Sequence, residues 1–320
     1  MKFVYKMHSA EEDPEAFASE DPEETLDEEA LFEELLASLE QEDLSEEDIA
    51  ALRIELPEML QGLSPETLEY IRNLGPHLER VIDQVGDLKA DGKIEGAVNV
   101  LVDFIENQEK VLEKIPDENL RNQILGMIGV LLDLDSIEKE LGQQAKLEVL
   151  SAGIDLIPVV GSVKMLTEAT MGKTAAGEKL EGKDRAKHAA WATAFVALDA
   201  IAVAGLVTGG TVSAAAEGGK VAVRAGTVAT KGAKAGKIIT RTAAFCRKVG
   251  KAGKTTKSVR TLFRVGSLMR KYPRIAGTLI KIVEKKRTVD KVRNINNIRG
   301  KLEKNTDPTT ILDQDLPSAA

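Results

Sequence analysis

The chain has 320 residues, of which 43% are hydrophobic and 3% aromatic, and it contains one cysteine. This length is sufficient for two modest domains, and the scarcity of aromatic residues beside abundant Ala, Leu, Glu and Lys favours helices over strands. The single cysteine excludes an internal disulfide framework, and the first residues, MKFVYKMHSAEED, lack the apolar stretch of a cleavable Sec signal.

The net charge of −9 conceals a strong asymmetry between the two halves of the sequence. Residues 1–150 carry 39 acidic and 12 basic side chains, a net charge of −27, whereas residues 151–320 carry 13 acidic and 31 basic ones, a net charge of +18. Such a pattern indicates an acidic tail, a basic binding surface, or two halves that neutralise each other.

The first half of the chain predicts an acidic tail followed by an acidic helical bundle. Residues 1–30 combine high negative charge with few large apolar side chains, so we expect them to be disordered. Residues 31–148 contain several amphipathic runs separated by short Gly, Asp and Pro breaks, which predicts a helical bundle. Ser45 with Asp48, and Ser64 followed by a proline, are typical of helix starts.

The second half predicts three further segments. Residues 149–216 contain DLIPVVGSVKMLTEA and an apolar run, separated by the Gly-rich TMGKTAAGEKLEGKD, and we expect an apolar helical hairpin with an exposed, partly basic tip. Residues 217–304 are rich in Gly, Ala and Lys and predict basic amphipathic helices, and residues 305–320 form a polar tail. The predicted fold class is therefore all-α.

Two motifs that suggest ligand binding fail on their spacing. A phosphate-binding loop ending in Gly172-Lys173-Thr174 needs a glycine where this chain has Thr167, so a helix-breaking turn is favoured. In DLKADGKIEGAV, residues 87–98, Lys89 and Val98 stand where a calcium loop needs oxygen ligands, so we expect a helix–turn–helix link.

No other pattern points to catalysis. The three histidines are widely spaced, without Cys or carboxylate partners at metal-ligand spacing, and no nucleophile–base set can be assembled. We therefore expect no catalytic, cofactor-binding or metal-binding residues and no cofactor, and we do not expect an enzyme.

The region around residues 150–206 resembles the pre-toxin TG domain of bacterial polymorphic toxins. The resemblance rests on Asp155, Pro158, Gly161, Gly172, Gly177, Glu178 and Arg185, in this order. The Thr-Gly pair that names the family is altered, because Met171 precedes Gly172 and Ala176 precedes Gly177. The resemblance implies an all-helical module, upstream of a toxin domain, that assists its export or delivery.

The apolar run at residues 189–212 has three possible environments. As a helix it would be about 36 Å long, enough to span a bilayer, with Trp191 near one interface and Gly205 and Gly209 forming a close-packing GxxxG motif. Asp199 at mid-depth disfavours insertion by about 2.5–3.5 kcal/mol. The alternatives are a helix buried in a bundle, with Asp199 at its edge, and a helix that fits a partner's groove.

The basic helices offer a second contact. We expect a surface formed by Arg260, Arg264, Arg270 and Lys271 to bind anionic lipid. Nonspecific nucleic-acid binding through residues 218–304 is a rival, although few aromatics are available for stacking on bases. A third possibility is that the acidic half binds the basic half, or that the protein binds a partner chain.

These patterns lead to one functional expectation and two alternatives. We expect a non-enzymatic interaction or delivery protein that engages a membrane through residues 189–212 and the basic helices. The alternatives are a soluble scaffold whose halves pair with each other or a partner, and a nonspecific nucleic-acid binder. For the first function we expect the protein to be membrane-associated or to be secreted by a non-Sec route. Otherwise we expect it in the cytoplasm.

Overall fold

A computed structural model describes most of the chain between residues 28 and 288. The described residues are 28–60, 63–133, 141–207, 233–251, 256–286 and 288. Within them every extended regular element is a helix, so the predicted all-α fold class is confirmed. An isolated bridge between Lys173 and Lys179 closes the tip of a hairpin.

The acidic half forms five of these helices. They are α1 (Glu28–Glu40), α2 (Glu46–Met59), α3 (Pro65–Ala90), α4 (Ile94–Leu112) and α5 (Glu118–Leu132). Ser45 and Asp48 form a reciprocal capping box at the start of α2, and Ser64 caps α3, as predicted. Helix α1 begins at Glu28, inside the range expected to be disordered, and the preceding residues lie outside the description.

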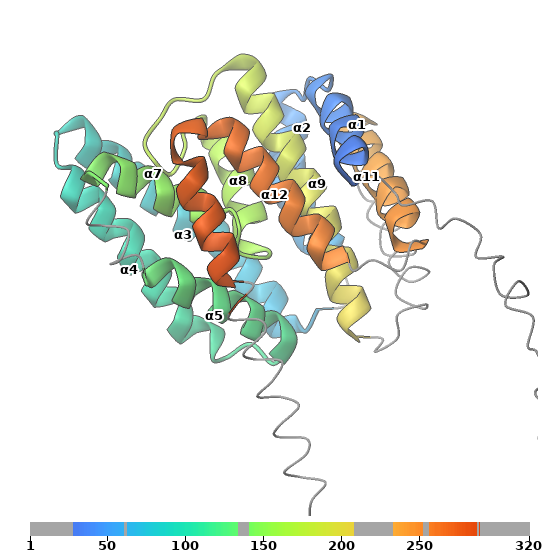
Figure 1. The fold of residues 1–320 in the computed structure, drawn as a ribbon, viewed down its shortest axis with the longest axis horizontal. Coiled ribbons are helices and arrows are strands. Elements are labelled where there is room, and N and C mark those ends of the chain that lie inside the picture. Colours follow the sequence, from blue (N-terminus) through green and yellow to red (C-terminus); the bar gives the residue numbers. More distant parts are fainter. Residues whose placement is uncertain are drawn as a thin grey trace, which may run out of the picture.

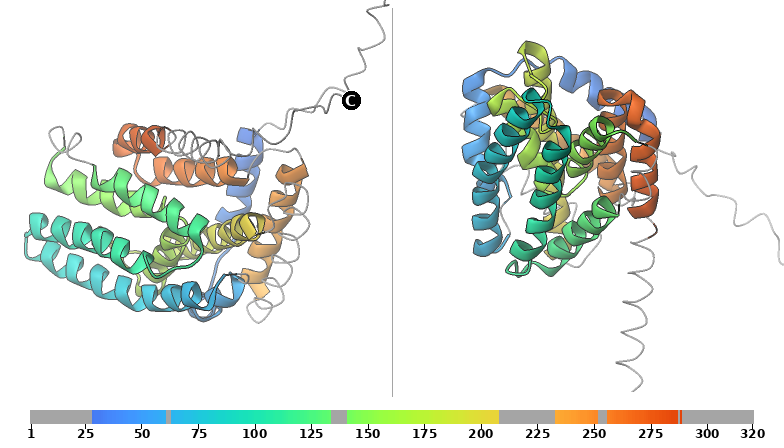
Figure 2. Two further views of the ribbon diagram at one scale, coloured as in Figure 1. Left: turned by 90° about the horizontal axis from the view of Figure 1, so that it is seen from below. Right: turned by 90° about the vertical axis from the view of Figure 1, so that its left-hand side faces the viewer.

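Helices α3 and α4 lie side by side as a long pair (Figure 2). Asp91 ends α3, Gly92 has a left-handed backbone with φ of 76°, and α4 starts at Ile94. The segment that was tested as a calcium loop is therefore the helix–turn–helix link that we expected.

The centre of the molecule is a helical hairpin. It follows α7 (Gln143–Ile154) and consists of α8 (Val160–Met171) and α9 (Gly182–Val207), which form the most extensive helix–helix contact of the described residues. Helices α1, α2, α11 and α12 also pack on α9 (Figure 1). The predicted hairpin is thus present, but the tip is not fully exposed, because Thr174, Ala175 and Ala176 are buried.

The basic helices cover the hairpin. They are α11 (Ala233–Lys251) and α12 (Thr256–Lys271), followed by the short 3₁₀ helix η2 (Pro273–Ile275) and a helix over residues 276–286. Their apolar faces are buried through Ile238, Ile239, Phe263 and Leu268, as amphipathic helices require.

One hydrophobic core runs from Leu35 on α1 to Val283 near the end of the described chain. Because α8 and α9 contact helices from both halves, packing continues across the segment boundaries expected near residues 148 and 216. Residues 208–232 and 289–320, which include parts of the expected basic region and the polar tail, lie outside the description.

Candidate functional site

The first ionic cluster consists of Asp155, Lys164, Glu168, His188 and Lys271. Asp155 follows the last turn of α7, and a sharp corner then starts α8, so Asp155 faces Lys164 on that helix. Lys164 Nζ donates to Asp155 Oδ1 at 2.6 Å and lies 2.9 Å from Glu168 Oε1, one turn further along α8. These three side chains are completely or almost completely buried, so each charge depends on its neighbours.

Helices α9 and α12 complete the first ionic cluster. His188 Nε2 on α9 lies 3.0 Å from Glu168 Oε2 and 2.7 Å from Lys271 Nζ on α12. Glu168 Oε1 also accepts a hydrogen bond from the backbone N–H of Ala175 at 2.7 Å. The cluster therefore ties the hairpin, its tip and the last turn of α12 together.

The pKa values in this cluster follow from burial and charge. Burial lowers the pKa of His188, Lys271 lowers it further, and Glu168 offsets only part of this. Burial alone would raise the pKa of Glu168, but Lys164, Lys271 and His188 together hold this pKa well below its usual value. Burial likewise opposes the charge of Lys164, yet Asp155 and Glu168 outweigh it and raise the pKa.

A neutral His188 fits between these charges. Its Nε2 atom can accept a hydrogen bond from the Lys271 ammonium group when the proton of the ring is on Nδ1. A protonated ring would instead donate from Nε2 to Glu168 and present a positive charge to Lys271. Protonation of His188 therefore weakens the attachment of α12 at this end.

The second ionic cluster consists of Ser162 on α8, Asp199 on α9 and Arg264 on α12. Arg264 Nη2 donates to Asp199 Oδ2 at 3.0 Å and to Ser162 Oγ at 2.8 Å. Ser162 Oγ in turn donates to Asp199 Oδ2 at 2.6 Å. Arg264 is 2% exposed, and its guanidinium group lies 4.9 Å from the centre of the Phe195 ring, so a cation–π contact adds to the ion pair.

The corner between α7 and α8 belongs to both clusters. Val159 adopts a left-handed backbone with φ of 64°, and its N–H donates to Asp199 Oδ2 at 2.9 Å. Arg264 Nη1 donates to the carbonyl of Ile157 at 2.7 Å. A Cβ atom on Gly161 would lie 2.3 Å from the carbonyl oxygen of Asp155, so only glycine fits there.

Three further positions of the family resemblance, Gly172, Glu178 and Arg185, lie at or just beyond the end of α8. Gly172 ends α8 in a left-handed conformation, which confirms the helix-breaking turn expected at the Gly-Lys-Thr sequence. Arg185 donates to the carbonyls of Ala169 and Thr170 at the end of α8. The side chain of Glu178 is exposed.

The hairpin tip docks on α3 of the acidic half. Lys89 Nζ donates to the carbonyl of Ala176 at 2.9 Å, and the Lys89 side chain lies against Gly177, whose φ is 73°. Lys173 Nζ lies 3.1 Å from Asp83 Oδ1. These contacts explain why the tip is less exposed than the sequence indicated.

The expected basic surface on α12 is only partly correct. Arg264 is buried because it lies on the same face as Leu268, one turn along α12, and finds its carboxylate inside. The side chain of Lys271 is 21% exposed and points to the first ionic cluster. Arg270 is exposed and pairs with Glu33. Arg260 lies on α12, but its side chain is not among those that the structure describes.

The expected membrane features of α9 have other environments. Trp191 is buried against Phe195, with ring centres 5.5 Å apart, and Asp199 is fully buried inside the second ionic cluster instead of at the edge of the helix. Gly205 lies in α9, whereas Gly209 is outside the described residues. None of the described helices combines the length and the apolar character needed to cross a membrane.

Sequence reasoning missed Ser162, Lys164, Glu168 and His188. Their signal is the pair Lys164 and Glu168, spaced four residues apart within an otherwise apolar helix, where buried charges need partners. In the part of the chain that the structure describes, no group of His, Cys, Asp and Glu could hold a metal ion. Comparison with protein-family models, curated proteins and solved structures gives no significant match.

Proposed function

We propose that this protein is a non-enzymatic helical interaction protein whose acidic half masks its basic helices, and that these helices bind an anionic membrane surface when they are released. The supporting observation is a row of ion pairs between the two halves. Arg270 lies 2.7 Å from Glu33 and 3.6 Å from Glu40, and Arg241 lies 2.6 Å from Glu42.

Further contacts join the two halves at other places. Lys234 Nζ on α11 donates to the carbonyl of Asp43 at 2.7 Å, and Lys285 pairs with Asp133. Arg185 of the hairpin pairs with Glu46 of α2. Charge asymmetry in the sequence thus has a local counterpart in side-chain pairs.

The exposed ion pairs and the buried apolar contacts contribute different amounts of free energy to the association of the two halves. An exposed ion pair contributes about 0–1 kcal/mol, so the surface pairs set the register of the halves more than they hold them together. Burial of a side chain such as Phe263 or Leu268 contributes about 1.5–3 kcal/mol and also hides the apolar face that a membrane would need. Release of α11 and α12 is therefore a prerequisite of membrane binding in this proposal.

Residues 150–206 resemble the pre-toxin TG domain, a module that assists the export or delivery of a toxin domain. This resemblance supports the proposal that masking of the basic helices serves delivery. A masked basic helix stays away from anionic lipids in the cell that makes it and becomes available at the target. The two ionic clusters, which fix the hairpin against α12, lie within or against this stretch.

Vesicle flotation of the intact chain tests the proposal. The triple variant Glu33→Lys, Glu40→Lys, Glu42→Lys reverses the acidic side of the surface pairs. We expect it to float with anionic vesicles about tenfold more readily than the unmodified protein, and to lose this binding in high salt.

A second triple variant provides the control. Glu58→Lys, Glu69→Lys and Glu109→Lys change the net charge equally, at exposed positions without an ion pair to another described residue. Equal flotation of both variants would mean that overall charge alone governs binding. Absence of flotation in both, although α11 becomes accessible to proteolysis, would refute the membrane as the partner.

A further inference from the structure

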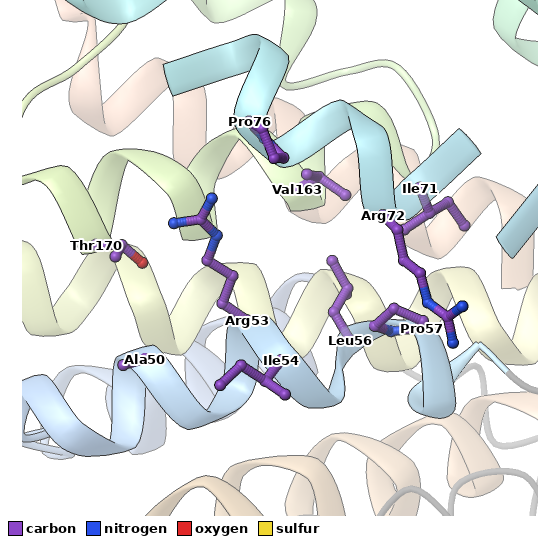
Figure 3. Close-up of a pocket in the computed structure, with 11 residues that line it drawn as sticks. Ala50, Arg53, Ile54, Leu56, Pro57, Ile71, Arg72, Pro76, Val163 and Thr170 are labelled. Atoms are coloured by element: carbon purple, nitrogen blue, oxygen red, sulfur yellow. The ribbon is translucent and has the colours of Figure 1, made fainter. Parts of the chain in front are cut away.

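A groove between α2 and α3 lies outside both ionic clusters. Its volume is about 490 Å³, within the range of small-molecule pockets. Figure 3 shows its apolar floor, which Leu56, Pro57 and Val163 share, with the arginines of the two helices on either side of Leu56. The lining residues are Ala50, Arg53, Ile54, Leu56, Pro57, Ile71, Arg72, Gly75, Pro76, Val163 and Thr170.

The two helices contribute the same local sequence pattern to the groove. Each has an arginine followed four residues later by a proline inside the helix, Arg53 with Pro57 in α2 and Arg72 with Pro76 in α3. A proline has no N–H, so the carbonyl four residues earlier loses its usual helical hydrogen bond. The backbone carbonyls of Arg53 and Arg72 therefore lack this donor beside their own cationic side chains.

Two side chains of the groove are also available for contact. Ile54 is 79% exposed, the highest value among the large apolar side chains of the described residues. Arg72 is exposed and has no ion-pair or hydrogen-bond partner for its side chain within the described part of the chain, whereas Arg53 pairs with Glu79. An occupant that suits these features brings an apolar side chain, carboxylates and backbone N–H donors.

We propose that the groove binds the chain's own segment Pro14–Asp21, with Phe17 against the apolar floor and its flanking carboxylates on the arginines. The sequence PEAFASED places Glu15 before Phe17 and Glu20 after it. In an extended conformation Glu15 and Glu20 are up to about 17 Å apart, which exceeds the 8–10 Å between packed helix axes. The backbone N–H groups of such a segment are donors of the kind that the carbonyls of Arg53 and Arg72 lack.

A short connection joins this segment to α1. Seven peptide units separate Asp21 from Glu28, the first residue of α1, and an extended chain of this length covers about 23 Å. Helix α1 joins α2, one wall of the groove, through residues 41–45, so the segment and the groove belong to neighbouring parts of the chain.

Disulfide trapping in the full chain tests this inference. In a Cys246→Ser background, Ala18→Cys next to Phe17 is combined with Ala50→Cys on the exposed rim of the groove. Under mild oxidation we expect a disulfide within one chain, seen as a fast-migrating monomer on a non-reducing gel. Arg72→Glu should slow its formation by about tenfold or more, and Phe17→Ala should slow it as well.

Matched controls separate docking from random collision. Ala18→Cys with Asn107→Cys, an exposed position on α4, reports collisions, and Arg80→Glu reverses an exposed arginine of α3 outside the groove. Equal trapping at positions 50 and 107, or equal slowing by Arg72→Glu and Arg80→Glu, would overturn the inference. Disulfides formed only between two chains would do so too, because they place another copy's segment in the groove. Vesicle binding plays no part in these outcomes.

Discussion

The α3–α4 pair and the α8–α9 hairpin both contribute to the buried core, but they differ in where their charged side chains lie. On α3 and α4 the buried positions are mostly apolar and recur with helical spacing, while charged side chains face outward. On α8 every residue from Val160 to Ala169 is buried, including Lys164 and Glu168. A helix at the edge of a bundle can direct its charges to water, whereas a central helix has to pair them inside.

The strongest test of this difference replaces the shared cation of the first ionic cluster. Lys164→Met keeps the length of the side chain but leaves Asp155 and Glu168 buried without their common partner. We expect a loss of about 3–5 kcal/mol in the free energy of unfolding, measured by urea denaturation.

Lys173→Met is the matched control, because Lys173 belongs to the same hairpin but pairs with Asp83 on the surface. Both side chains of that pair are about half exposed, so the expected loss is below about 1 kcal/mol. Similar losses for the two variants would contradict the distinction between central and peripheral charges.

A second, smaller effect concerns pH. The pKa of His188 is lowered in the folded protein, so below about pH 6.5 the unfolded chain binds a proton that the folded chain does not. Stability should therefore fall as the pH drops from about 7.5 to 5.5, by at most about 1.4 kcal/mol per pH unit for this group. The stabilisation from Glu168 is lost only below the ordinary pKa of a glutamate, outside this range.

The variant His188→Gln isolates that contribution. Burial and the neighbouring Arg80 also lower the pKa of His77, so the unmodified protein and the variant share the part of the pH dependence that His77 causes. Unfolding curves at several pH values should show a shallower slope for His188→Gln. An unchanged slope would show that His188 gains a proton as readily in the folded chain as in the unfolded one.

A third comparison concerns two buried tyrosines, one with a hydrogen-bond partner and one without. Tyr70 on α3 donates to Gln108 Oε1 at 2.9 Å, so Tyr70→Phe leaves a buried acceptor and should cost about 1–2 kcal/mol. The hydroxyl of Tyr272 is buried without a hydrogen-bond partner among the described residues, so Tyr272→Phe should change stability by less than about 0.5 kcal/mol. Thermal unfolding of both variants gives the comparison, and a larger loss for Tyr272→Phe would reveal a partner for its hydroxyl.

Much of the fold follows from local sequence signals. Ser45 with Asp48, Ser64 with Pro65 and the apolar spacing of α3 and α4 predict helix starts and buried faces, since each depends on residues a few positions apart. The hairpin is also predictable from two apolar runs around a Gly-rich turn.

The two ionic clusters were harder to predict because their partners are far apart in the sequence. Arg264 and Asp199 are separated by 65 residues, and Lys271 and His188 by 83. In the sequence alone, Arg264 belongs to a helix rich in basic residues and therefore suggested a lipid-binding surface. Asp199 interrupts an apolar run and therefore suggested a free-energy cost of membrane insertion. Only the packing of α12 on α9 shows that each residue compensates the other.

The left-handed conformation of Val159 has a consequence for how the molecule opens. This conformation costs a β-branched residue of the order of 1–3 kcal/mol. Two hydrogen bonds hold the corner in place: Val159 N–H donates to Asp199, and Arg264 donates to the carbonyl of Ile157. When α12 leaves, Arg264 leaves with it, and the corner can relax to an ordinary backbone. The amide of Val159 should therefore exchange with deuterium together with the amides of α12, although the two segments are about a hundred residues apart along the chain.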